Sequence, residues 1–172
     1  MEIFCMKESS GCIQESILLT ILELDIIGLQ MKFPEGFYQM EEEKSRRCYP
    51  WKGRPDIILE NCDGVQVTGQ TTGQEMKKSD IVPAVEAARK LAENTFPQYS
   101  FSPVYLCEKG ELPVGWFRIK MPDRKEQHIK AFSVMQDEMI LLTFTYPDTE
   151  EIKWKSLILY SFGTWGKLHG TD

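Results

Sequence analysis

The chain has 172 residues, of which 42% are hydrophobic and 27% are charged, and its formal net charge at pH 7 is −6. A chain of this length can bury a sizeable core as one domain, so it needs neither a disulfide nor a metal ion to fold. The acidic balance argues against nonspecific binding of nucleic acid, which requires a basic face.

The soft metal ligands are too scattered to predict a metal site. The five cysteines are odd in number and form no C-x-x-C pair, and neither His128 nor His169 lies near a cysteine in the sequence. This spacing does not match a zinc site, and we expect no metal and no cofactor. Reduced thiols in a cytoplasmic protein are the simpler interpretation.

The N-terminal part contains an apolar run, residues 17–29, that Glu23 and Asp25 interrupt. It is shorter than the roughly 20 residues that span a bilayer. Three acidic residues precede it, which is the wrong charge for a signal peptide, so we expect neither export nor a membrane segment. Residues 1–16 are weakly patterned and are expected to form an N-terminal extension, followed by a single domain over 17–172.

The first half of this domain is predicted to contain three strands. They lie at 24–33, 56–59 and 65–72. The proline and glycine at 34 and 36 mark a turn after the first strand, and the turn at 61–64 joins the other two into a hairpin. The charged stretch 41–55 is expected to be a loop with at most one helical turn.

A helix is predicted next, from Ser79–Asp80 to about Asn94. Pro83 falls in its first turn, where a missing N–H costs little, and Ile81 and Val85 share its apolar face. Four strands follow, at 99–107, 113–121, 127–136 and 138–146. The last two are joined too tightly for anything but an antiparallel hairpin.

The last predicted element is an amphipathic helix after Pro147. Asp148 suits its N-cap and Glu151 the third position of a capping box, while Ile152 and Trp154 belong to its apolar side. The order of elements predicts an α+β fold in which an antiparallel β-sheet is flanked by helices.

Four stretches of the chain resemble the PsbP-like superfamily, which contains the photosystem II protein PsbP and the Ran-binding factor Mog. They are MKFPEGFYQM (31–40), RPDIILENCDGVQVTGQ (54–70), the helix at 80–95, and HIKAFSVMQDEMILLTFTYPDTEEIKWKSLILYSF (128–162). The chain is accordingly identified as a bacterial member of unknown function. The resemblance implies an α/β/α sandwich and a noncatalytic role in binding other proteins. It supplies no catalytic residues, because the fold hosts unrelated tasks.

The first candidate binding surface is the loop RRCYPWKGR at 46–54. It places Arg47 and Arg54 around Trp51, a mixture of cations and an aromatic ring that suits an anionic or stacking partner. The simpler alternative, which we favour, is a surface loop whose arginines pair with the acidic run 41–43, with Trp51 resting on the sheet.

The second candidate surface is one face of the strand 113–121. Trp116, Arg118 and Lys120 alternate along it, and exposed Trp and Arg are common binding anchors. Two alternatives stay open: the N-terminal extension covers this face, or Trp116 is packed and the cations are merely solvated.

No catalytic set is recognisable. The chain has no G-x-S-x-G and no H-E-x-x-H, and a near match to a phosphate-binding loop at 64–71 carries Gln70 where the lysine belongs. We therefore expect no enzyme but a noncatalytic protein-binding module, such as an adaptor, a chaperone-like protein or an immunity-type protein. The alternative is a small-ligand-binding or enzymatic domain with an apolar pocket between sheet and helix. The identity of the protein partner and the oligomeric state are left open.

Overall fold

The computed structural model describes residues 1–7 and 13–168. Its strands form two antiparallel sheets, a four-stranded one in the order β1-β2-β3-β12 and an eight-stranded one in the order β4-β5-β6-β11-β10-β9-β7, with β8 also paired to β9. The strands are β1 (Glu2–Lys7), β2 (Ile13–Leu24), β3 (Leu29–Pro34), β4 (Tyr38–Gln39), β5 (Ile57–Glu60), β6 (Gln66–Glu75), β7 (Ser100–Phe101), β8 (Tyr105–Cys107), β9 (Val114–Met121), β10 (Glu126–Met135), β11 (Glu138–Pro147) and β12 (Gly166–Lys167).

The α-helices are α1 (Glu42–Cys48), α2 (Ile81–Thr95) and α3 (Glu151–Phe162), and four 3-10 turns are η1 (Asp25–Ile27), η2 (Lys78–Asp80), η3 (Pro122–Arg124) and η4 (Asp148–Glu150). Among the described residues, no helix is both long and apolar enough to cross a membrane. The expected α+β class, with an antiparallel sheet and flanking helices, is confirmed.

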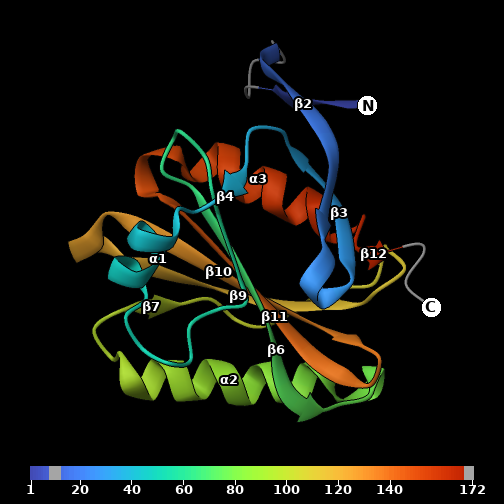
Figure 1. Cartoon of the computed structure of the whole chain (residues 1–172), viewed down its shortest axis with the longest axis vertical. Coiled ribbons are helices and arrows are strands. Elements are labelled where there is room, and N and C mark those ends of the chain that lie inside the picture. Colours follow the sequence, from blue (N-terminus) through green and yellow to red (C-terminus); the bar gives the residue numbers. More distant parts are fainter. Residues whose placement is uncertain (8–12, 169–172) are drawn as a thin grey trace.

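The large sheet lies between α2 on one face and α3 on the other (Figure 1). On the α2 side, Ile81 and Val85 pack with Phe117 and Phe132 in what we call the α2-side core. On the other face, Trp154, Leu157 and Phe162 of α3 belong to a larger cluster, the α3-side core, to which the four-stranded sheet contributes residues such as Met31. Two cores therefore share one sheet, as in an α/β/α sandwich.

Elements with strong local signals form where they are expected. The helix predicted from Ser79–Asp80 is α2, and β5 and β6 form the predicted hairpin. Its turn is closed by Asn61, whose Oδ1 accepts hydrogen bonds from the backbone N–H groups of Asp63 (3.0 Å) and Val65 (2.9 Å). β10 and β11 form the tight antiparallel hairpin.

The N-terminal region differs from the prediction. The strand expected at 24–33 is interrupted by η1 and by Gly28, whose φ of +69° reverses the chain between β2 and β3. Residues 2–7, expected in an extension, form β1 and pair with β2. The boundary expected after residue 16 falls inside β2. Residues 8–12 and 169–172, including His169, lie outside the described residues.

Three smaller expectations were also wrong. The loop 41–55 contains α1, which has seven residues and exceeds a single turn. The strand expected at 99–107 is divided into β7 and β8. The helix start at η4 and α3 has no side-chain capping hydrogen bond, so Asp148 is not the cap, and Ile152 is 76% exposed and does not belong to the apolar side.

Candidate functional site

The face of β9 that carries the second candidate surface is turned toward α3. Trp116 is only 9% exposed, and its ring lies 4.8 Å from the ring of Tyr105 and 5.8 Å from that of Phe162, centroid to centroid. Trp116 is thus a core residue, in agreement with the alternative in which it is packed. It is not accessible as a binding anchor.

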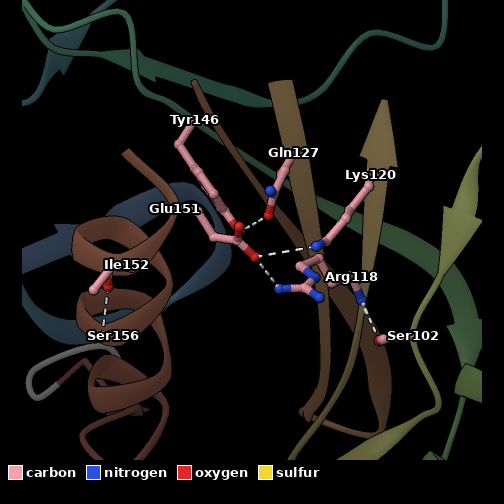
Figure 2. A network of polar contacts seen from close by, with 8 residues as sticks. All are labelled: Ser102, Arg118, Lys120, Gln127, Tyr146, Glu151, Ile152 and Ser156. Carbon is pink, nitrogen blue, oxygen red and sulfur yellow. Dashed lines mark hydrogen bonds and ion pairs between the residues drawn. The ribbon is translucent and has the colours of Figure 1, made fainter. Parts of the chain in front are cut away.

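Arg118 and Lys120, further along β9, meet the first residue of α3. Arg118 Nη1 donates to Glu151 Oε1 at 2.6 Å, and Lys120 Nζ lies 3.5 Å from the same oxygen (Figure 2). The backbone N–H of Arg118 donates to Ser102 Oγ at 2.8 Å. A carboxylate at a helix N-terminus is also favoured by the helix dipole, so these contacts fasten the start of α3 to the sheet.

Two neutral side chains complete this network. The buried Tyr146 hydroxyl donates to Gln127 Oε1 at 3.0 Å (Figure 2). Burial raises the pKa of Tyr146 above its ordinary value, so the phenol stays protonated and acts as a donor. Burial alone disfavours the Glu151 anion, but the Gln127 amide and the charges of Lys120 and Arg118 outweigh it and lower the pKa of Glu151.

The chemistry of this network is structural. One carboxylate is shared by two cations, and the tyrosine is held as a neutral hydrogen-bond donor, so the described contacts provide no activated nucleophile or base. Arg118 and Lys120 are recognisable from the sequence as two cations on one face, but Glu151 is not recognisable as their partner. The only signal for Glu151 was its expected position at the start of the final helix.

The first candidate surface lies at the end of α1 and in the turn that follows. Trp51 is 57% exposed, and its ring meets that of Tyr49 edge-on at 6.0 Å. The expectation that Trp51 rests on the sheet was therefore wrong. Arg47 and Lys52 are also exposed, and neither forms an ion pair with any residue in the described ranges.

The other arginines of this loop are partly neutralised by one acid. Arg46 Nε lies 3.0 Å from Glu42 Oε1, and Arg54 Nη1 lies 3.7 Å from the same atom. The predicted pairing of the arginines with the acidic run 41–43 thus holds for Arg46 and Arg54 but not for Arg47. The loop brings Arg47 and Trp51 to the surface and leaves Arg54 half-buried.

The turn that carries Trp51 is anchored to the large sheet. Tyr49 Oη donates to Gln66 Oε1 of β6 at 2.9 Å, and Lys44 Nζ of α1 donates to Glu60 Oε2 of β5 at 2.6 Å. Burial raises the pKa of the Tyr49 phenol, so it remains a hydrogen-bond donor. The exposed Trp51 side chain is consequently carried by a segment that is held in place on the large sheet.

The apolar pocket required by the alternative function is not formed in the described part of the chain. The space between the large sheet and α3 is filled by aromatic rings, among them Phe33, Phe144 and Trp154. A groove of about 430 Å³ lies at the surface between the start of α2 and the segment before β9, where Lys78 and Glu108 line it together with Val82. It is open to solvent and mixes charged with apolar side chains, unlike the mostly apolar cleft of a small-molecule site.

Histidine and cysteine side chains do not gather into a site. His128 Nε2 lies 3.1 Å from Glu126 Oε1, and this hydrogen bond lowers the pKa of Glu126. Within residues 1–7 and 13–168, no three of the His, Cys, Asp and Glu side chains lie close enough to hold a metal ion. The four cysteines in these ranges are free thiols.

Comparison with known proteins identifies the fold. A scan against protein-family models finds no match, and neither does a search of the curated proteins. Among solved structures, the chain is similar to the cyanobacterial PsbP protein (CyanoP) of Synechocystis sp. PCC 6803, with a TM-score of 0.59 and 11% sequence identity, over 87% of this chain and 92% of that one. A protein from Bacteroides thetaiotaomicron also matches, with a TM-score of 0.44 and 11% identity, over 84% of this chain and 47% of that one.

The likeness to CyanoP extends over 87% of this chain. At 11% identity it establishes the architecture and leaves the activity open. The predicted resemblance is confirmed at the level of structure: the chain has a PsbP-like fold.

Proposed function

We propose that the chain is a noncatalytic protein-binding module that meets its partner through Arg47, Trp51 and Lys52, here called the Trp51 surface. The observation that carries the proposal is the 57% exposure of the Trp51 side chain on an anchored turn. Tryptophan and arginine are the residues most often found to dominate the binding energy of protein interfaces. An adaptor, a chaperone-like protein and an immunity-type protein would all work in this way.

The anchoring of the turn supports this choice of surface. A binding residue that is already held in place loses little conformational freedom when the partner arrives. The Tyr49–Gln66 and Lys44–Glu60 hydrogen bonds supply this order before binding. The unpaired charges of Arg47 and Lys52 favour a partner with acidic groups around an apolar pocket.

The β9 face is the weaker candidate. Trp116 is buried, and Arg118 is already satisfied by Glu151. A partner that used Arg118 would have to break this pair and detach the start of α3, which is costly for a half-buried ion pair. Lys120, whose side chain is 42% exposed, is more accessible than Arg118, but it too lies close to Glu151, at 3.5 Å.

The proposal is tested by affinity purification of the tagged chain from its own cells, followed by binding measurements on purified components. We expect one stoichiometric protein partner whose affinity falls at least tenfold with Trp51→Ala and with Arg47→Glu. Phe96→Ala, which removes an exposed ring at the end of α2, is the matched control and leaves affinity unchanged. Equal binding by all variants would exclude the Trp51 surface.

Native mass spectrometry of the purified chain separates this function from its alternative. A mass equal to that of the polypeptide, or of whole multiples of it, agrees with a binding module, whereas a retained small molecule would favour a ligand-binding or enzymatic domain. The proposal keeps the expected cytoplasmic location in a bacterium, which the free thiols of the described cysteines support.

A further inference from the structure

The strand β1 is an unusual edge of the structure. The terminal strands β4, β7 and β12 have two residues each, and β8 has three, whereas β1 has six. Short edge strands are a common protection against unwanted pairing, because they offer few free backbone groups. Among the terminal strands of the two sheets, β1 is therefore the long one.

Apart from a charged residue at each end and one irregularity, this edge lacks the other protective features. Residues 2–7 contain no proline, and the pairing with β2 is irregular only between Met6 and Lys7. Ile3 is 65% exposed, and Cys5 is exposed as well. Within residues 1–7 and 13–168, no strand lies on the outer side of β1. The β1–β2 hairpin lies beside α3, and Glu15 Oε1 of β2 accepts a hydrogen bond from Lys153 Nζ at 2.9 Å.

The edge is nevertheless held in a fixed position. Glu2 Oε2 accepts from Lys32 Nζ at 2.5 Å, and the Tyr160 hydroxyl of α3 donates to the other oxygen of Glu2. The ring of Phe4 lies 5.3 Å from that of Tyr160, so the body-facing side chains of β1 rest on α3. Its outward backbone N–H and C=O groups are thereby presented in the extended geometry that a further strand requires.

We propose that β1 pairs antiparallel with β1 of a second copy of this chain, about a two-fold axis at Phe4. A two-fold axis perpendicular to the sheet keeps side chains on matching faces, so residues whose numbers sum to eight lie opposite one another. Ile3 then faces Cys5 of the second copy, and Glu2 faces Met6. The exposed Ile3 of each copy is covered by Cys5 of the other, and no two side chains of like charge lie opposite one another.

Self-complementarity is what favours a second copy over an unrelated peptide. An unrelated strand could satisfy the same backbone groups, but nothing in β1 selects one. In the symmetric pairing each copy supplies both the exposed Ile3 and the thiol that it meets. The two four-stranded sheets join into one continuous sheet of eight strands, which removes the long edge from both copies.

The first test is the mass of the purified full chain in solution, measured by size-exclusion chromatography with light scattering over a wide concentration series. We expect the mass to rise toward twice 19.9 kDa for the natural chain and to stay at 19.9 kDa for Ile3→Lys. Ile26→Lys, at a position that is 68% exposed in η1, is the matched control and dimerises normally. A natural chain that remains monomeric throughout overturns the proposal.

The second test locates the interface and does not depend on the stability of a variant. In the proposed register the two Cys5 residues lie diagonally across the axis, at about 7–8 Å, within reach of a short bismaleimide. A chain with Cys5 as its only cysteine is expected to form a covalent dimer, and a chain with only the exposed Cys62 is not. A dimer that forms without cross-linking through Cys5, or that persists in Ile3→Lys, would lie on another surface. Capture of a foreign strand by β1 in place of a second copy would likewise contradict the proposal.

Discussion

Side-chain exposure separates Trp51 from the other three tryptophans. Trp51 is 57% exposed, whereas Trp116, Trp154 and Trp165 are buried in the α3-side core. Replacing a buried indole by a methyl group removes its transfer free energy and leaves a cavity, whereas an exposed ring loses little of either. The tryptophan of the first candidate surface, Trp51, is therefore available for binding, whereas that of the second, Trp116, stabilises the fold.

Alanine substitutions at Trp116 and Trp51 are expected to differ strongly in stability. Trp116→Ala should lower the free energy of unfolding by about 3–5 kcal/mol, and Trp51→Ala by less than about 0.5 kcal/mol. Urea unfolding followed by far-UV circular dichroism measures both. If Trp51→Ala destabilised the protein as much as Trp116→Ala, the indole would be packed, and the Trp51 surface would lose its main anchor.

The Glu151 carboxylate is expected to make stability depend on pH. Its pKa is lower in the folded protein than in the unfolded chain, so its contribution is complete above the unfolded pKa and is lost as the pH falls through the folded pKa. Glu151→Gln should cost about 1 kcal/mol at pH 7, because Arg118 loses its ionised partner, and nothing once the carboxyl is protonated. The measurement is urea unfolding at pH 7 and at acidic pH.

Glu93→Gln is the matched control for this comparison. Glu93 pairs with Arg89 on the exposed side of α2 at 3.2 Å, an ion pair of the kind that contributes little to stability. Its substitution should change the free energy of unfolding only slightly at either pH. A Glu151→Gln cost that persisted unchanged in acid would show that the carboxylate charge is not what holds Arg118.

At the scale of elements, what the sequence predicts depends on how local the signal is. The β5–β6 and β10–β11 hairpins contain their own turn signals, and α2 contains its own apolar periodicity, and each forms as expected. The pairing of β1 with β2 and the contact of Arg118 with Glu151 join residues that no local pattern relates. Alternation along β9 shows which residues share a face but not that α3 covers this face, so the sequence alone makes Trp116 a surface candidate.

The β10–β11 turn can be improved by two substitutions. Gln136 and Asp137 have φ values of +51° and +60°, the backbone of a two-residue turn that favours Asn-Gly. Gln136→Asn combined with Asp137→Gly should therefore raise the free energy of unfolding by about 0.5–1 kcal/mol, measured by urea unfolding. No gain, with an unchanged spectrum, would mean that the native residues are not strained there.

The contact of α2 with β9 depends on a missing side chain. A Cβ added at Gly115 would lie 2.8 Å from Ile81 Cγ2 and 2.9 Å from Val85 Cγ2, closer than such atoms approach. Gly115→Ala should push α2 from the sheet and cost about 1–3 kcal/mol. Gly53→Ala, where nothing lies within 4 Å, is the control, and thermal melts of both variants make the comparison. If Gly115→Ala were as stable as Gly53→Ala, α2 would be able to shift away from the sheet without a loss of stability.

At the scale of the whole molecule, the large sheet separates two cores that differ in whether they contain tryptophan. The buried tryptophans all belong to the α3-side core, and the α2-side core contains none. Tryptophan fluorescence therefore reports mainly on one face of the sheet. β9, β10 and β11 contribute residues to both cores. If these strands unfold, the residues of both cores therefore become exposed.

This shared sheet predicts that the domain unfolds as one cooperative unit. Val85 is fully buried in the α2-side core, and Val85→Ala should cost about 2 kcal/mol. If the two cores are coupled, this substitution shifts the urea midpoint seen by tryptophan fluorescence as far as the midpoint seen by circular dichroism, although Val85 lies across the sheet from every buried indole. If the α2 layer unfolds by itself, only the circular dichroism midpoint moves, and the transition becomes biphasic. Leu157→Ala, in the α3-side core, should shift both signals in either case, so it establishes that the fluorescence signal follows unfolding on its own face.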